Sequence, residues 1–178
     1  MSDQRHLVTG ANGQDGGYLV ARLLEAGHEV HAMCHSRDGR ERLAVEQPQV
    51  VGHVADLADA TAIGRLIADI APSRIYNLAG NTSVARSWEY PAETADVLGL
   101  GPVRILDAAW RQGNRASPVR VLQASSAEIF GDATQVPQNE NTPRMPVTPY
   151  GAAKSFAHEM AAIYRARGMH VSNAILYR

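Results

Sequence analysis

Cysteine, long hydrophobic runs and targeting signals are nearly absent from this sequence of 178 residues. Its only cysteine, Cys34, excludes an internal disulfide and a metal site built from several thiolates, and it fits a reducing compartment. The seven histidines never take an HExxH or similar spacing, so we expect no bound metal. Residues 1–6 are polar and only a short apolar run follows, which predicts neither a signal peptide nor a membrane span. We therefore expect a cytoplasmic protein.

Concentrated charge of one sign is also lacking. The formal net charge is −1, and no five like charges follow one another. The sequence therefore indicates no surface for nucleic acid or for a membrane. Small molecules are the expected partners, and the length suits one domain with a sizeable core.

Short β-branched runs alternate with stretches of helical periodicity along the chain. Helical spacing marks residues 18–26, 63–70 and 91–112, although Gly99, Gly101 and Pro102 interrupt the last. Strands that alternate with helices predict a parallel sheet covered on both faces, so the fold class is α/β, a doubly wound Rossmann sheet. The six predicted strands are residues 6–9, 29–34, 50–54, 74–78, 119–124 and 170–176.

One segment lacks regular periodicity, and one expected part of the fold is missing. Residues 132–149 are rich in proline and polar side chains, which predicts a loop able to border a site. Nothing follows the sixth strand from which a C-terminal substrate lobe could form, so we expect that lobe to be absent.

A glycine turn follows the first predicted strand. Gly10, Gly13 and Gly16 form a GxxGxxG pattern that leads directly into a helix. Glycines let the backbone turn sharply, and they let a pyrophosphate approach the free N–H groups of a helix N-terminus. Strand, turn and helix together are the context of a dinucleotide site, so we expect one NAD(P)-binding domain over residues 1–178. A purely structural turn is the alternative.

The end of the second predicted strand bears on the choice of cofactor. NAD sites usually carry an acidic residue here, whereas this sequence has Ser36 and Arg37, which suit a 2′-phosphate. NADP is therefore favoured, with NAD as the other possibility and a solvated basic turn as the alternative. Asp56 and Leu57 follow the third strand, where the adenine is expected, although Asp56 would equally serve to cap the helix that begins near Asp59.

Tyr150 and Lys154 are the first pair with catalytic chemistry. They are spaced i, i+4 at a helix start, with Thr148 as the expected N-cap and Pro149 at the first helical position. A nearby ammonium stabilises a phenolate, so Tyr150 is a candidate base, while Lys154 is also placed to hold a nicotinamide ribose. A surface pair is the alternative for this motif alone.

Ser126 and Glu128 lie at the end of the fifth predicted strand, the edge at which doubly wound folds bind ligands. The Ser126 hydroxyl is suited to bind a sugar hydroxyl. A carboxylate such as Glu128 can abstract a proton beside a carbonyl or protonate a leaving hydroxyl. The alternative is that Ser125 and Ser126 satisfy loop backbone groups and that Glu128 is a solvated acid.

These motifs together resemble the GDP-mannose 4,6-dehydratase family of extended short-chain dehydrogenases/reductases. The resemblance runs in order along essentially the whole chain. Its matching stretches are TGANGQDGGYL from Thr9, IYNL from Ile75, TADV from Thr94, QASSAE from Gln123, PQ from Pro137 and PYGAAK from Pro149.

The resemblance implies a nucleotide-sugar 4,6-dehydratase with GDP-mannose as the expected substrate. Such an enzyme oxidises C4, eliminates water across C5 and C6, and returns the hydride to C6. Ser126, Glu128, Tyr150 and Lys154 would be catalytic, with Thr82 and Ser125 also touching substrate. The implied cofactor contacts are Gly10, Gly13, Gln14, Asp15, Gly16, Asp56, Leu57, Leu78, Asn81, Tyr150 and Lys154.

Departures from the family pattern gather on the sugar side. Ser126 stands where Thr is usual, and Arg144 and Met145 replace two aromatics. The alternatives are a decarboxylase or a C4-epimerase on the same scaffold, or a non-catalytic NADP-binding module, which the short chain would suit. A homo-oligomer is also expected.

Overall fold

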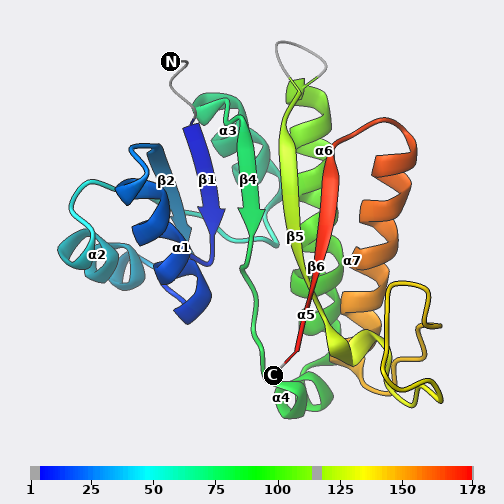
Figure 1. The fold of residues 1–178 in the computed structure, drawn as a ribbon. Helices are drawn as coiled ribbons and strands as arrows, with labels where there is room; N and C mark the ends of the chain where they lie inside the picture. The colour runs from blue at the N-terminus through cyan, green and yellow to red at the C-terminus, as the bar shows by residue number, and fades with distance from the viewer. Residues whose placement is uncertain (1–4, 114–117, 178) are drawn as a thin grey trace.

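Six parallel strands form the centre of the molecule in a computed structural model that describes residues 5–113 and 118–177. Their order is β3-β2-β1-β4-β5-β6, so the chain starts in the middle, moves to one edge and then crosses to the other (Figure 1). This order confirms the predicted doubly wound sheet. The strands are β1 (Arg5–Thr9), β2 (Glu29–Cys34), β3 (Val51–Val54), β4 (Arg74–Asn77), β5 (Arg120–Ser126) and β6 (Val171–Leu176).

The helices pack on the two faces of the sheet unequally. The elements are α1 (Gln14–Glu25), α2 (Arg37–Glu46), α3 (Ala60–Ile70), α4 (Val84–Glu89), α5 (Pro91–Thr94), the π-helix η1 (Ala95–Leu100), α6 (Gly101–Gly113), the 3₁₀-helix η2 (Ala127–Ile129) and α7 (Pro149–Ala166). One apolar cluster joins β1 and β2 to α1 and α2, and a larger one joins the strands to α3, α6 and α7.

The predicted cover of both sheet faces is only partly correct. Among the described residues no helix lies over β5 and β6 on the face turned to the viewer in Figure 1. The larger cluster, with Ile75, Ile105 and Val171 among its members, lies on the opposite face.

The helix boundaries differ from prediction where periodicity was weak or broken. The predicted interruption within residues 91–112 is instead a π-helical turn: the Gly101 N–H donates to the Asp96 carbonyl, five residues back, so the chain passes Pro102 without breaking the helix. Two helices were missed. α2 buries only Gly39 and Leu43 and is otherwise charged or exposed, while α4 has six residues, so neither carries an apolar stripe.

The shared direction of the strands brings several turns together at one end of the sheet. The turns after β1, β4 and β5 all leave the sheet at the C-terminal ends of the strands, because parallel strands share a direction (Figure 1).

The polar start of the chain, residues 1–4, lies outside the described residues. The segment predicted as a loop, residues 132–149, contains no helix or strand before α7 begins at Pro149.

Candidate active site

The glycine turn after β1 has the backbone shape that was predicted. Gly10 has φ +67°, which favours glycine, and Gly13 is the N-cap of α1. Gly16 is buried in the first turn of α1, where an added Cβ would overlap the Gly10 carbonyl oxygen. The backbone of the turn is therefore packed so closely that Gly16 has no room for a side chain.

The N-terminus of α1 differs from those of most other helices in the sheet layers. Side chains of Ser36, Asp59, Ser83 and Thr148 accept hydrogen bonds from the first turns of α2, α3, α4 and α7, whereas α1 has no side-chain cap. Its free N–H groups are the donors that an anion needs. Gln14 and Asp15 follow Gly13 and are exposed. This arrangement fits the pyrophosphate of a dinucleotide.

Ser36 and Arg37 lie at the start of α2, beyond the end of β2. The Ser36 Oγ accepts the Gly39 N–H at 3.1 Å, which leaves its hydroxyl proton for another partner. Arg37 lines a hollow of about 660 Å³ between α2, β3 and α3, together with Arg40 and His53. Both predicted cofactor residues are exposed.

The turn after β3 is held by a residue that the sequence did not single out. Asp56 accepts the Ala58 N–H at 2.9 Å, and Leu57 is buried. Arg104 of α6 donates to the Leu57 carbonyl at 3.0 Å and to the Asp96 carboxylate at 2.6 Å. The alternative in which Asp56 caps the next helix is wrong, because Asp59 accepts the N–H groups of the first turn of α3.

Three predicted contact residues follow β4. Leu78 is half-buried and packs on the apolar cluster of α1 and β2, directly beside the glycine turn. Asn81 accepts the Ser83 N–H at 2.9 Å, and both Asn81 and Thr82 are exposed. The segment therefore presents polar side chains at the edge where the strands end, as a ligand site requires.

Tyr150 and Lys154 occupy the buried face of α7, which begins with Thr148 as N-cap and Pro149 in its first turn, as predicted. Both are over nine-tenths buried. The Lys154 Nζ lies 5.8 Å from the centre of the Tyr150 ring and donates to the Ala124 carbonyl oxygen at 3.1 Å. Burial lowers the pKa of Lys154 to about 8, so the side chain is still mostly an ammonium at neutral pH.

Ser126 and Glu128 meet this pair where β5 ends. The Ser126 Oγ accepts the Glu128 N–H at 3.2 Å and begins η2, which packs against α7. An added Cβ at Gly151 would lie 2.5 Å from the Glu128 carbonyl oxygen, so the backbones of η2 and α7 touch beside Tyr150. The four predicted catalytic residues thus come from three elements, β5, η2 and α7, and α7 is in direct contact with the other two.

Ser125 is buried, whereas its predicted role as a substrate contact requires an accessible side chain. Its side chain is 3% exposed, and its Oγ is 2.9 Å from the Nδ1 of His158, one helical turn beyond Lys154. Strand alternation explains the difference, because Ser125 and Ser126 point to opposite faces of β5.

A buried polar row crosses the sheet below the site and was not predicted. Sheet pairing aligns Thr9, Asn77 and Gln123 on neighbouring strands. The Thr9 hydroxyl donates to Asn77 at 2.6 Å, and Asn77 donates to Gln123 at 2.7 Å. Gln123 in turn donates to the Ala124 carbonyl at 2.9 Å, the same oxygen that Lys154 binds. The row links the glycine turn to the catalytic lysine.

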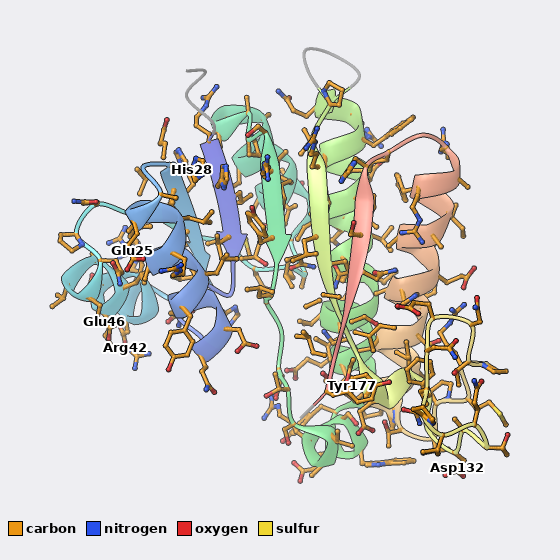
Figure 2. The ribbon with its side chains drawn as sticks, viewed as in Figure 1. Glu25, His28, Arg42, Glu46, Asp132 and Tyr177 are labelled. Atoms are coloured by element: carbon orange, nitrogen blue, oxygen red, sulfur yellow. The ribbon has the colours of Figure 1, made fainter. Side chains whose placement is uncertain are left out.

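The loop before α7 borders the site. Arg144 forms an ion pair with Glu159 of α7, and the Tyr177 hydroxyl donates to Gln138 at 3.1 Å. Figure 2 shows Tyr177 and Asp132, which begins this loop, at the same end of the molecule. Within residues 5–113 and 118–177 no cluster of three or more His, Cys, Asp or Glu is arranged to hold a metal ion. No helix in those ranges is both long and apolar enough to cross a membrane.

A doubly wound sheet with an uncapped glycine turn and a buried Tyr–Lys pair at its strand ends defines a short-chain dehydrogenase/reductase domain of the nucleotide-cofactor-dependent type. The family model for GDP-mannose 4,6 dehydratase matches residues 7–178. The chain belongs to the GDP-mannose 4,6-dehydratase family.

Individual relatives agree with this assignment. The human GDP-mannose 4,6 dehydratase is 38% identical over 96% of this chain and 49% of its own length. GDP-mannose 4,6 dehydratase 1 of Arabidopsis thaliana is 39% identical over 96% of this chain and 50% of its own length. The chain therefore spans about half the length of the curated relatives that it matches.

Solved structures share the fold. UDP-glucose 4-epimerase of Thermotoga maritima superposes with a TM-score of 0.85 at 23% identity, covering 96% of this chain and 54% of that one. The enzyme of the same name from Thermus thermophilus, solved in complex with NAD, gives a TM-score of 0.82 at 26% identity over the same shares.

Proposed function

We propose that this chain is the cofactor-binding and catalytic half of a nucleotide-sugar 4,6-dehydratase that converts GDP-mannose to GDP-4-keto-6-deoxymannose. One observation carries the proposal: Ser126 at the end of β5 and Glu128 on η2 belong to a segment packed directly against α7, which bears Tyr150 and Lys154. A redox pair and a separate carboxylate are both needed to oxidise C4 and then eliminate water.

The cofactor would be bound by backbone groups first. The uncapped N–H groups of α1 suit the pyrophosphate, with Gly10, Gly13 and Gly16 leaving room for its approach. Lys154 would hold the nicotinamide ribose. NADP, when bound, accepts a hydride from C4 and returns it to C6. The further contacts that we propose are Gln14, Asp15, Ser36, Arg37, Asp56, Leu57, Leu78, Asn81 and Tyr150.

We favour NADP over NAD because of the start of α2. Arg37 and the Ser36 hydroxyl lie at a helix N-terminus, and this sequence has no acidic residue at either position that would repel a 2′-phosphate. Replacing Arg37 by Gln is expected to weaken NADP binding about tenfold and to leave NAD binding unchanged, measured by titration. An equal loss for both dinucleotides would contradict the preference.

Tyr150 would act as the base for the C4 hydroxyl. As its phenolate it takes the hydroxyl proton while C4 is oxidised, and the buried Lys154 ammonium stabilises the phenolate charge. Ser126 would donate its hydroxyl proton to the sugar oxygen at C4. The positive charge of Lys154 therefore assists the step that creates the 4-ketone.

Glu128 would carry the elimination. The 4-ketone acidifies the C5–H bond, so the carboxylate can take that proton, and the resulting carboxylic acid can give it to the hydroxyl that leaves C6 as water. One proton thus moves from C5 to the leaving oxygen, and the proton that Tyr150 took from the C4 hydroxyl would go to C5 when the hydride returns to C6. Thr82 and the loop of residues 132–149 lie at the same edge and would contact the sugar nucleotide.

The deciding experiment is to incubate this chain with NADP⁺ and GDP-mannose and to weigh the product. Loss of one water supports the proposal, and Glu128→Gln is expected to abolish that loss while still permitting C4 oxidation. Glu46→Gln, the same change at an exposed acid that ends α2, is the matched control and should retain activity. With UDP-sugars, loss of carbon dioxide would indicate a decarboxylase and a new isomer of unchanged mass an epimerase. Cofactor binding without any product would favour a binding module.

We further infer a homo-oligomer in a reducing cytoplasm. An uncharged apolar hollow of about 400 Å³ lies between η1 and α7, with Leu100 and Phe156 each 45% exposed beside it. A second copy offers the same apolar face, so a twofold contact would bury both. Phe156→Glu should convert the oligomer to a monomer in sedimentation; an unchanged mass would argue against this face. Cys34 is buried as a thiol, which suits such a compartment.

A further inference from the structure

His158 has no part in the proposed chemistry, although its side chain and its main chain are both bound to the sheet. Its Nδ1 lies 2.9 Å from the Oγ of Ser125 on β5. Its carbonyl oxygen accepts the Asn173 side-chain N–H of β6 at 3.1 Å. Asn173 pairs with Gln123 in the sheet register, so His158 lies at the end of the buried polar row that begins at Thr9.

The position of His158 along α7 gives this contact its meaning. Lys154 and His158 are one helical turn apart, and they bind Ala124 and Ser125, which are consecutive in β5. Two turns of the helix are thus fixed against two residues of the strand. Such a pair sets the axial position of α7 relative to β5, because sliding by one residue would break both contacts.

The two contacts differ in whether they involve a residue of the proposed reaction. On the proposed function, Lys154 also contacts the cofactor ribose and the phenolate, so its ammonium is shared between these groups and the Ala124 carbonyl. The Ser125–His158 contact lies one turn further along α7, is buried and involves none of the residues proposed to react. It persists when the lysine is engaged.

We propose that His158 is a positioning residue: through Ser125 it holds α7 in register with β5, so that Tyr150 and Lys154 stay opposed to Ser126 and Glu128. This inference rests on the proposed function for its effect on rate, but not for its effect on structure. Displacement of catalytic groups by about 1 Å lowers rates by up to about 100-fold.

The test compares substitutions that keep or remove a polar atom at the Nδ1 position. His158→Leu and Ser125→Ala should each lower kcat about tenfold or more, with KM for the sugar nucleotide changed less than threefold. The double variant should lose no more than the worse single variant, because both break one contact. His158→Asn places an amide where Nδ1 lies and should restore most of kcat. His158→Gln places it further out and should not. His170→Leu, an exposed histidine before β6, is the control and should match the parent.

Hydrogen exchange separates this inference from the proposed function, because it needs neither substrate nor cofactor. His158→Leu should speed exchange of the Glu128 amide, which Ser126 binds, at least about fivefold, while amides of β1 keep the parent rate. If the parent chain forms no product, the exchange result alone judges His158. Unchanged exchange with unchanged kcat, or an Asn variant no better than the Leu variant, would overturn the positioning role.

Discussion

Backbone atoms form the cofactor side of this site, and side chains form the catalytic side. At the glycine turn, Gly13 leaves α1 without a side-chain cap and Gly16 has no room for a Cβ. At the catalytic end, Thr148 caps α7 and its buried face carries Tyr150 and Lys154. Two helices on one sheet therefore present opposite surfaces at their first turns: one offers bare N–H groups to an anion, and the other offers titratable groups to a sugar.

The two sides therefore tolerate different substitutions. The pyrophosphate site at the start of α1 is made of N–H groups, so there it is the addition of atoms that abolishes binding. A site made of buried side chains fails when they are truncated, and it carries the energetic burden of burying polar groups. Four experiments sharpen or break this comparison, in order of decreasing expected effect.

Truncation at the catalytic side should have the largest effect on rate. Tyr150→Phe removes the proposed base without opening space beside Leu98 and Ala153, against which the ring packs. Turnover is expected to fall by about 10²–10⁴-fold, the usual contribution of general acid–base catalysis. Dinucleotide affinity by fluorescence titration should stay within threefold of the parent. A matching loss of affinity would show that the two sides are not separable.

Lys154→Met should abolish turnover and raise stability. Burial lowers the Lys154 pKa from 10.5 to about 8, so between these values the unfolded chain holds the proton more firmly than the folded one. Stability therefore rises with pH across that window, and below pH 8 the folded state carries the full burden of the buried ammonium. Removing it is expected to stabilise by on the order of 3 kcal/mol. Thermal unfolding at pH 7 and pH 10 measures this, and a lower melting temperature at pH 7 would refute it.

Adding one carbon at the cofactor side should lower stability and abolish dinucleotide binding. Gly16→Ala places a methyl group against the Gly10 backbone and is expected to destabilise by about 1–3 kcal/mol and to abolish dinucleotide binding. Gly64→Ala in α3, where nothing lies within 4 Å of the added carbon, is the matched control. It should stabilise by about 0.5–1 kcal/mol. Denaturant unfolding and titration read both, and retained binding by the Gly16 variant would break the comparison.

Low pH should destabilise the folded chain through His6 of β1. This residue is 1% exposed on β1, and burial first, then His28 and Arg74, lower its pKa from 6.5 to about 4. The unfolded chain binds the proton first as the pH falls, so stability is lost from about pH 6.5 down toward pH 4. The expected loss between pH 7 and pH 5 is about 2 kcal/mol. His6→Phe should flatten this profile, whereas the exposed His170→Phe should not; equal profiles would contradict the assignment.

Local patterns predicted the parts of the molecule whose structure depends on neighbours in sequence. The six strands, the turn at Gly10 and the cap at Thr148 depend on residue types within a few positions of one another. The missed elements lack such a signal. α2 is a mostly charged helix stabilised by its Ser36 cap, and the π-helical turn before Pro102 follows from packing that no periodicity records.

The site divides in the same way. Tyr150 and Lys154 share a helix face by spacing alone, and Ser126 and Glu128 share a turn. Arg104 at the Leu57 carbonyl and His158 at Ser125 could not be predicted, because each joins segments more than thirty residues apart. Ser125 itself illustrates the limit, since its identity suited a substrate contact and only the pleat of β5 turned it inward.

By itself the sequence determined the alternation of strands and helices, the glycine turn and the pairing of a tyrosine with a lysine, because these follow from propensity and period. The tertiary structure decided that α1 stays uncapped, that Lys154 is buried against Ala124, and that a polar row runs from Thr9 to Gln123. The physical reason is that burial and lateral register arise only when distant strands align. Both depend on the whole sheet rather than on any one segment.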